Sequence, residues 1–388
     1  MSGLEGEPGR GEQLSLGFIA DPNSVHTRRW IEWFARAGHA IHLVDPFAVT
    51  IEPGLPPAVA IHRLEPPSSK VPILGLLRRR RRLRAALESI GLDVLHAQFV
   101  RRYGWQAGLS GFHPLVVSPW GSDLLQVPRT AGRTRWWNRF ALRAADLVTV
   151  SSEGMRAASI RAGARPDRIE HIHHGVDTSR FAPGQPEEAV LAQLGPTTDG
   201  PRIMSLRAIR PLYRHETAID AVAILTGPDS RPRLLMSALG ADAAYLATLW
   251  ARARARGIEE QLVVLDGVPH EQLPGLYRAA DVMVSIPETD SFPVTLLEAM
   301  ATEVPTVVSD VPAVTPVYGP LDPVARELVV PVGDADATAM AIRRALDLGP
   351  DERARLGSRL RDFVIASADY DTHMRRMEGL YRRLAAAR

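Results

Sequence analysis

The chain contains no cysteine among its 388 residues, and it contains a single lysine, Lys70. The absence of cysteine excludes disulfides, thiolate zinc sites and cysteine nucleophiles. Arginine supplies the rest of the fixed basic charge. Any site that would ordinarily use lysine must therefore use a guanidinium, which stays protonated at all working pH values.

Long apolar runs and a charge imbalance are missing as well. No stretch of 18 apolar residues occurs, so no membrane-spanning helix is predicted. Residues 1–13 are rich in Gly and Glu, do not resemble a signal peptide and are expected to be disordered. With 46 basic and 44 acidic residues the formal net charge is +2, which predicts no general attraction to nucleic acid. We therefore expect a cytoplasmic protein.

Strand-like and helix-like patterns alternate along the whole chain, which is typical of βαβ units and parallel sheets. The length favours two domains. The predicted strands span residues 14–20, 40–45, 60–64, 94–98, 115–120, 147–152 and 169–173 in the first half, and 203–207, 233–238, 262–265, 281–286, 306–309 and 328–332 in the second.

A stretch at 175–187 is rich in turn formers and lacks periodicity, so it separates the two halves. We predict an α/β protein with an N-terminal domain at 14–180, a C-terminal domain at 181–365 and a basic helical tail at 366–388.

The most informative segment is a strand, a loop and a helix between residues 281 and 301. Asp281–Ile286 is predicted to be a buried parallel strand, and Pro293 suits the first position of the helix that follows. The loop thus lies at the carboxyl end of a strand and at the N-terminus of a helix, where open α/β sheets bind phosphorylated ligands. Two carboxylates, Asp290 and Glu298, could hold ligand hydroxyl groups there.

This segment resembles the signature of the family-4 retaining glycosyltransferases (glycosyl transferases group 1), GT-B enzymes that transfer a sugar from a nucleotide diphosphate. The family's usual text is Glu-Gly-Phe-Gly, four residues, and a second Glu within Leu-Glu-Ala-Met-Ala. Asp290 matches the first Glu, one methylene shorter, and Glu298 matches the second. The resemblance implies that Glu298 holds the ribose hydroxyls and Asp290 the donor sugar, with Glu288 as the alternative to Asp290.

Shorter matches in the same order extend the resemblance over nearly the full length, at residues 25–30, 37–44, 93–97, 118–125, 150–154 and 174–181. It implies two doubly wound Rossmann-like domains that face each other across a cleft. The N-terminal domain would bind the acceptor, the C-terminal domain would bind the nucleotide sugar, and the tail would cross back onto the first domain. No cofactor is implied, because the nucleotide sugar is a substrate.

Arginines follow the first strand of the second half. A departing nucleotide diphosphate is strongly negative, and fixed cations stabilise such charge without reorganising. Arg207 and Arg214 match the family's Arg and Lys positions, with Arg210 as the alternative to Arg214. The resemblance implies that these two arginines act with Asp290 and Glu298 as the catalytic set. The other expected donor contacts are Ser291, Phe292, Val294, Thr295, Gly267, Val268 and Trp120.

A metal could serve in place of the arginines. The chain contains one Asp-x-Asp text, at Asp334 and Asp336. Its neighbours indicate a turn and a helix start, with one of the two carboxylates as the N-cap. We therefore expect no metal site.

Loops of the first half supply the expected acceptor side. Trp120 stands where the family commonly has a His near the donor sugar; an indole transfers no proton, but it can stack on a sugar and donate one hydrogen bond. His26 and Arg28 follow the first strand, in a loop expected to reach the acceptor. Asp123 is expected on the same side, or else as a cap of the next helix.

The run from Arg78 to Arg84 is the strongest charge cluster. It predicts either a solvated helix face or a basic amphipathic helix on an anionic membrane, and Trp136 and Trp137 add aromatic side chains that favour such an interface. We expect weak peripheral contact with the inner face of the plasma membrane.

The function expected from these patterns is retaining, metal-independent transfer of a hexose or N-acetylhexosamine from an NDP-sugar to a hydroxyl acceptor, which is a glycan, a lipid-linked compound or a small molecule. The alternatives are a sugar-nucleotide epimerase or glycoside phosphorylase on the same fold, and a non-catalytic subunit that binds sugar nucleotides.

Overall fold

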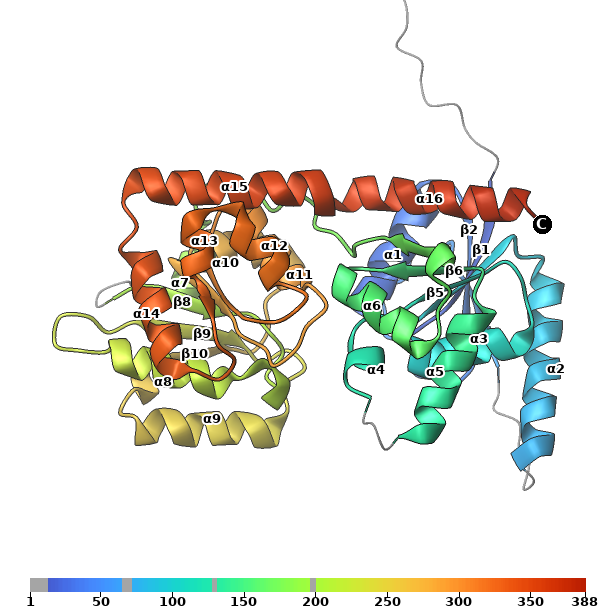
Figure 1. Ribbon diagram of the computed structural model, residues 1–388, viewed down its shortest axis with the longest axis horizontal. Helices are drawn as coiled ribbons and strands as arrows, with labels where there is room; N and C mark the ends of the chain where they lie inside the picture. Colours follow the sequence, from blue (N-terminus) through green and yellow to red (C-terminus); the bar gives the residue numbers. More distant parts are fainter. Residues whose placement is uncertain (1–12, 65–71, 128–130, 196–199) are drawn as a thin grey trace, which may run out of the picture. The chain divides into compact units, whose positions relative to one another are not determined.

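The computed structural model describes residues 13–64, 72–127, 131–195 and 200–388. The expected disordered segment at 1–13 therefore lies, apart from Gln13, outside the described residues. The chain divides into two compact units (Figure 1): an N-terminal unit that runs to His173 and includes Thr372–Arg388, and a C-terminal unit of His174–Asp371.

The N-terminal unit is built on a seven-stranded parallel sheet in the order β3-β2-β1-β4-β5-β6-β7. Its strands are β1 (Ser15–Ile19), β2 (Ala40–Asp45), β3 (Ala60–Arg63), β4 (Val94–Gln98), β5 (Leu115–Ser118), β6 (Leu147–Val150) and β7 (Ile169–His171). Its helices are α1 (Val25–Arg36), α2 (Pro72–Ile90), α3 (Trp105–Ser110), α4 (Ser122–Leu125), α5 (Gly132–Ala144), α6 (Glu153–Ala162) and most of α16 (Tyr370–Ala386).

The end of the chain packs into this N-terminal unit. The hydroxyl of Tyr381, which is fully buried, lies 2.5 Å from Nδ1 of His96 in the central strand β4. Nε2 of His39 lies 3.2 Å from Oε1 of Glu378. Residues from Thr372 onward thus complete the core of a unit whose other residues come from the start of the chain.

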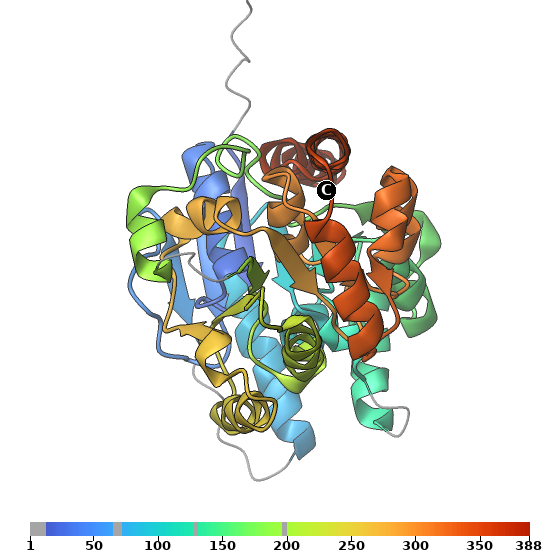
Figure 2. The ribbon, with the colours of Figure 1, turned by 90° about the vertical axis from the view of Figure 1, so that its left-hand side faces the viewer.

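The C-terminal unit holds a six-stranded parallel sheet in the order β10-β9-β8-β11-β12-β13. Its strands are β8 (Arg202–Ser205), β9 (Arg233–Ser237), β10 (Leu262–Leu265), β11 (Val282–Ser285), β12 (Thr306–Ser309) and β13 (Val329–Val330). Its helices are α7 (Glu188–Leu194), α8 (His215–Leu225), α9 (Ala243–Ala255), α10 (Leu273–Arg278), α11 (Val294–Ala301), α12 (Thr315–Tyr318), α13 (Pro323–Glu327), α14 (Ala335–Leu346) and α15 (Pro350–Ala368). Figure 2 shows the neighbouring helices α8 and α9, in yellow-green and yellow, nearly end-on.

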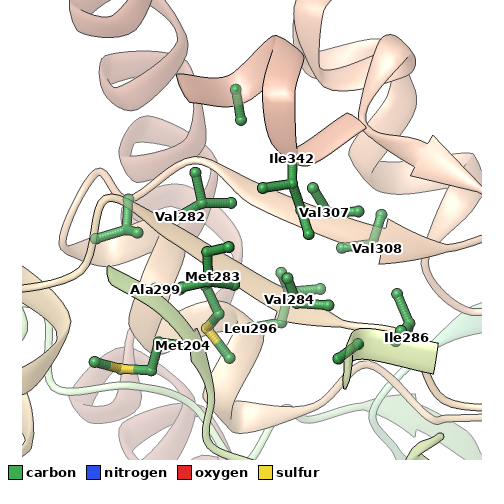
Figure 3. Close-up of a cluster of buried hydrophobic side chains, with 14 of the residues drawn as sticks. Met204, Val282, Met283, Val284, Ile286, Leu296, Ala299, Val307, Val308 and Ile342 are labelled. Atoms are coloured by element: carbon green, nitrogen blue, oxygen red, sulfur yellow. The ribbon is translucent and has the colours of Figure 1, made fainter. Parts of the chain in front are cut away.

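Strand β11 is buried along its whole length, as its uninterrupted apolar sequence requires. Figure 3 shows its side chains among those of β8, β12, α11 and α14, where the labelled residues include Met204, Val307, Leu296 and Ile342. Packing against helices fixes the strands of this sheet in position. The loops that follow the strands are therefore attached to a rigid frame.

The strand order of each sheet reverses beside its first strand, between β1 and β4 and between β8 and β11. At such a switch point the crossovers leave in opposite directions and open a crevice at the carboxyl ends of the two strands, where α/β proteins bind ligands. The loops after β8 and β11 therefore form the candidate ligand-binding edge of the C-terminal sheet.

Every predicted strand is present among the described residues, with ends that differ by two residues or less. The boundary between the units lies at 173/174 rather than 180/181, because the N–H of Val176 donates to Ala368 O at 2.9 Å and Arg361 donates to Thr178 O at 3.0 Å within the C-terminal unit. The return to the N-terminal unit lies at 371/372 rather than 365/366.

Two further findings concern helices. Pro293 is the extended residue just before α11 and not its first helical residue, as its ψ of 144° shows. Within the described parts of the chain, no helix is long and apolar enough to span a bilayer.

Candidate active site

The loops after β8 and β11 meet through one ion pair. Nη2 of Arg207 lies 2.6 Å from Oδ2 of Asp290, and Nη1 of Arg207 donates to Oγ1 of Thr295 at 3.1 Å. The two side chains of the pair are only 12% and 8% exposed. A guanidinium is thus held at the point where the loop after β11 enters helix α11.

Neighbouring groups fix the orientation of this pair. The guanidinium carbon of Arg207 lies 4.3 Å from the centre of the Tyr213 ring, a cation–π contact. The second carboxylate oxygen of Asp290 accepts from the N–H of Ser291 at 2.7 Å. Both charged groups are therefore oriented before any ligand binds.

Helix α11 begins beside this pair without a side-chain cap. The N–H groups of its first residues, Val294 and Thr295, lie at the positive end of the helix dipole and can bind an anion. Phe292 has a φ of 75°, a strained value for a residue with a side chain, and its ring is 5% exposed. Phe292 belongs to the hydrophobic core of the C-terminal unit, where its ring centroid lies 6.0 Å from that of Phe363.

Glu298 lies one turn further along α11 and is 6% exposed. Its Oε2 accepts a hydrogen bond of 2.8 Å from the hydroxyl of Tyr277 in α10. Burial, together with the nearby Glu298, raises the pKa of Tyr277 well above its ordinary value, so the phenol stays protonated and donates. Tyr277 was not predicted, because nothing in one sequence shows that its hydroxyl reaches a helix 21 residues later.

Arg214 completes the cluster on its other side. Its Nη1 lies 3.1 Å from Oε1 of Glu288 and 3.4 Å from Oε1 of Glu216. A Cβ on Gly333, after β13, would lie 2.7 Å from Nη2 of Arg214. The glycine therefore gives the guanidinium its room. Glu288 and Asp290 each pair with a different arginine, so the alternative acid belongs to the same cluster.

Three other expected residues, Arg210, Gly267 and Val268, do not take part in the cluster. The side chain of Arg210 is exposed and has no hydrogen-bond or ion-pair partner among the described residues, so Arg214 is the arginine that pairs with the acids. Gly267 and Val268 follow β10, which is separated from β8 by β9. Gly267 is exposed with open space beside it, whereas Val268 packs against the core. Among the described residues, neither Gly267 nor Val268 is a hydrogen-bond or ion-pair partner of Arg207 or Asp290.

In the N-terminal unit, Asp123 holds the loops after β4 and β5 together. Its side chain is fully buried and accepts from the N–H groups of Val100 at 2.8 Å, Gly121 at 2.9 Å and Trp120 at 3.1 Å. Burial raises the pKa of Asp123, and these three donors oppose the rise. Asp123 does not cap the helix that follows, so that alternative for it is wrong, and its side chain is fully buried. It is a positioning residue.

The other acceptor-side residues differ from one another. The ring centroids of His26 and Trp120 lie 5.6 Å apart, edge to face, which brings the first turn of α1 next to the loop after β5; His26 is thus in a helix and not in the expected loop. Arg28 instead donates to the backbone oxygens of Pro22 at 2.9 Å, Glu52 at 2.8 Å and Pro53 at 2.6 Å. Its guanidinium is occupied in tying two loops together, so the acceptor role expected for Arg28 finds no support.

The Asp-x-Asp text lies at the start of α14. Oδ1 of Asp334 accepts from the N–H of Ala337 at 2.8 Å, which makes Asp334 the N-cap, as one of the two interpretations of this text predicted. Across the described ranges, no group of three or more His, Asp or Glu side chains is arranged to hold a metal ion.

Solved structures of the same architecture are GT-B glycosyltransferases, and this chain has that fold. It is similar to sucrose-phosphate synthase from Thermosynechococcus elongatus, with a TM-score of 0.78 and 22% identity over 96% of this chain and 100% of that one. It is also similar to HepE of Anabaena in complex with UDP-glucose, with a TM-score of 0.74 and 16% identity over 96% and 100% of the two chains.

Family comparisons are more specific. The family described as "Glycosyl transferases group 1" matches residues 187–363, and "Glycosyltransferase Family 4" matches residues 24–180. The two matches together cover most of the chain. The chain belongs to the group 1, family 4 glycosyltransferases.

Curated relatives are distant. The chain is 32% identical over 223 residues to the GDP-mannose-dependent alpha-(1-6)-phosphatidylinositol monomannoside mannosyltransferase of Mycolicibacterium smegmatis. It is 25% identical over 242 residues to D-inositol 3-phosphate glycosyltransferase 2 of Catenulispora acidiphila. The matches span 55% and 56% of this chain, and about half of the length of these relatives, 55% in each case.

Proposed function

We propose that the chain transfers a hexose or N-acetylhexosamine from an NDP-sugar to a hydroxyl acceptor, with retention at the anomeric carbon and without a metal. The observation that carries this proposal is the contact of Arg207 with Asp290 and Thr295 at the switch point of the C-terminal sheet. The cation and the helix N-terminus suit the diphosphate, which is the charged leaving group of such a donor, and the carboxylate suits the hydroxyls of its sugar.

Each part of the donor has a group that suits it. Arg207, Arg214 and the first N–H groups of α11 bind the diphosphate, while Glu298 accepts from the ribose hydroxyls and Asp290 from the sugar. The nucleobase lies near the open space beside Gly267. The nucleotide sugars in the names of HepE's complex and of the mannosyltransferase support a donor of this class.

The reaction breaks the bond between the anomeric carbon and the leaving phosphate oxygen. The acceptor hydroxyl attacks the anomeric carbon from the same face, and its proton passes to that phosphate oxygen. Arg207 and Arg214 stabilise the charge that develops on the diphosphate, which is the task a divalent ion would otherwise perform. Activity that survives a strong chelator supports this account, and a stringent magnesium requirement contradicts it.

A thermal-shift screen of UDP, GDP, ADP and their sugars tests donor binding first, because a ligand that binds only the folded state raises the melting temperature. Product analysis with a labelled donor then separates the alternatives. A labelled glycoside formed only with an acceptor supports transfer, whereas isomerised donor without acceptor indicates an epimerase. Phosphate-dependent cleavage of a glycoside indicates a phosphorylase. Donor binding without turnover or hydrolysis indicates a non-catalytic subunit.

We also propose weak contact of the N-terminal unit with the anionic inner face of the plasma membrane. In α2, Leu83 and Leu87 are buried while Arg78, Arg81 and Arg82 are exposed. The ring centroids of Trp105 and Trp137 lie 4.8 Å apart, and those of Trp137 and Trp136 lie 4.6 Å apart. Trp136 is 58% exposed. The guanidinium carbon of Arg79, in α2, lies over the Trp105 ring. The arginine face and the exposed indole thus belong to one continuous region.

Sedimentation with anionic liposomes tests this contact. Binding at low salt that is lost at high salt supports it, because exposed charges are screened by salt. Failure to sediment at low salt ends the proposal.

A further inference from the structure

Two histidines on neighbouring strands of the N-terminal sheet face each other outside the site described above. Nδ1 of His42, in β2, lies 3.1 Å from Nε2 of His62, in β3. Their ring centroids are 5.3 Å apart, and the ring planes differ by 32°. Both residues are half-buried, so solvent reaches them. They are 20 residues apart in the sequence, which is why no metal-binding motif marks them.

The register of the sheet brings the two side chains together. His42 is aligned with Ala60, and His62 is aligned with Val44, so both histidines lie on one face of the sheet as diagonal neighbours. On its other side, His42 is aligned with Gly17 of β1. Because glycine and alanine stand beside His42 in the neighbouring strands, its imidazole has room to reach that of His62.

The pair has no acidic partner. His113, in the same unit, lies 2.6 Å from a carboxylate oxygen of Asp146, whereas neither His42 nor His62 forms an ion pair within the described ranges. Burial lowers the pKa of both rings, and the nearby His62 adds to the decrease for His42. Both imidazoles are therefore neutral at neutral pH, which is the form that binds a metal ion.

The distance between the two nitrogens suits a shared ion. Imidazole nitrogens lie about 2.0–2.1 Å from zinc and neighbouring ligands enclose angles of about 90–110°, so two chelating nitrogens lie about 2.8–3.4 Å apart. The 3.1 Å between Nδ1 of His42 and Nε2 of His62 lies within this range. In the metal-free protein the same distance fits an N–H···N hydrogen bond. For both nitrogens to bind an ion, the donating ring moves that proton to its other nitrogen.

We propose that His42 and His62 together bind one divalent transition-metal ion of the group zinc, nickel and copper. Imidazole suits these metals, whereas magnesium and calcium prefer oxygen ligands. In the part of the chain that the structure describes, no third His, Asp or Glu completes a metal-binding group. Water therefore fills the remaining positions of the ion, which stays exchangeable.

The ion would tie the edge of the sheet to its interior. Strand β3 is an edge strand that pairs with β2, and three of its four residues are exposed. An ion held by one residue from each strand adds a link across this last strand pair. Because the ion binds the folded arrangement, it stabilises the N-terminal unit by mass action. It takes no part in the proposed transfer, so turnover that resists a chelator remains the expectation.

Metal binding is measured on the full chain after treatment with a chelator and removal of the chelator. Isothermal titration uses Zn²⁺, Ni²⁺ and Cu²⁺, with Mg²⁺ as the metal that prefers oxygen. The test variants His42→Gln and His62→Gln each remove one ligand and keep a polar side chain. The matched control is His113→Gln, which changes a histidine of the same unit that pairs with Asp146 instead. Electron paramagnetic resonance of the copper-loaded protein counts the coordinated nitrogens.

We expect one ion per chain, bound most tightly for Cu²⁺, and no binding of Mg²⁺ at this site. Loss of a residue that only orients a metal ligand costs about 10–100-fold in affinity, so loss of either histidine should cost at least about ten-fold. His113→Gln should keep the wild-type affinity. The copper spectrum should show two coupled nitrogens in the wild type and one in His62→Gln. Zinc should raise the melting temperature of the wild type but not that of the two test variants.

Three results would overturn the proposal: no saturable binding of Zn²⁺, Ni²⁺ or Cu²⁺, wild-type affinity in His42→Gln or His62→Gln, or an equal loss in His113→Gln. In the first case the pair is only a hydrogen bond between strands, and in the other two the ion is bound elsewhere. None of these measurements requires a nucleotide or turnover. Failure of this site therefore leaves the proposed transfer untouched, and failure of the proposed transfer leaves this site untouched.

Discussion

Replacing Arg207 with Met is the most informative perturbation of the C-terminal unit. Methionine keeps much of the side-chain volume but removes the charge. The carboxylate of Asp290, which is 8% exposed and 2.6 Å from the guanidinium, then has no counter-charge. Two separate losses follow: one of stability, from a stranded buried charge, and one of catalysis, from a missing cation beside the diphosphate.

The sizes of the two losses differ. Removing one partner of a buried ion pair typically costs about 3–5 kcal/mol, and we expect about 3 here because both groups retain some exposure. For a unit of this size the melting temperature should fall by roughly 6–12 °C. Loss of one preorganised charge donor should lower the rate by about 10²–10³.

The double variant Arg207→Met with Asp290→Asn separates these effects. It removes the stranded charge, so the melting temperature should recover by most of the loss, whereas nucleotide-sugar turnover should stay low. Differential scanning calorimetry and an assay of nucleotide diphosphate release measure the two quantities. Recovery of turnover together with stability, or an unchanged melting temperature in the single variant, would refute the reasoning.

Three other predictions concern single groups. Glu298→Ala and Arg214→Ala should each lower turnover by about 10²–10³, and wild-type turnover in both would remove them from the site. Tyr277→Phe deletes the donor to Glu298 and should weaken nucleotide binding by about ten-fold, measured by titration; unchanged affinity would show that Glu298 needs no such support. Burial lowers the pKa of His96 to about 3, from 6.5. Between about pH 3 and pH 6.5 His96 is protonated in the unfolded chain but neutral in the folded one. The contribution of neutral His96 to the free energy of unfolding is therefore complete above pH 6.5, and it falls with acidification by up to about 1.4 kcal/mol per pH unit. Burial also lowers the pKa of His173 to about 3, so His96→Gln should reduce this pH dependence of the free energy of unfolding without abolishing it, and an unchanged slope would contradict the prediction.

The fold could be predicted from the sequence because its strands are buried on both faces. Runs such as Val282–Ser285 are apolar without interruption, and the polar segments between runs separate them clearly. The ends of the strands were less predictable. The strand predicted to end at Arg207 ends at Ser205, and the side chain of Arg207 pairs with Asp290 in the loop after β11. The unit boundary was misplaced for a similar reason: residues 174–180 have loop-like composition, and only their hydrogen bonds to α15 and the residues after it assign them to the C-terminal unit.

The cluster of arginines and acids was also predictable, because strand order brings the loops after β8 and β11 together. What the sequence could not show was the partner of each polar side chain. Arg28 and Asp123 form hydrogen bonds with backbone groups. Because every residue has a backbone carbonyl, and every residue except proline a backbone N–H, the sequence does not indicate which residues are the partners. Tyr277 meets Glu298 only through the packing of α10 on α11. Pro293 fits both the first helical position and the residue before it, since its fixed φ suits either.

The most direct test is a crystal structure of the chain with an intact NDP-sugar or a non-reactive analogue. We expect diphosphate oxygens within about 3 Å of the guanidinium nitrogens of Arg207 and Arg214, and ribose hydroxyls at a similar distance from the Glu298 carboxylate. A nucleotide bound elsewhere, with the Arg207–Asp290 pair untouched and no ligand at α11, would contradict the account.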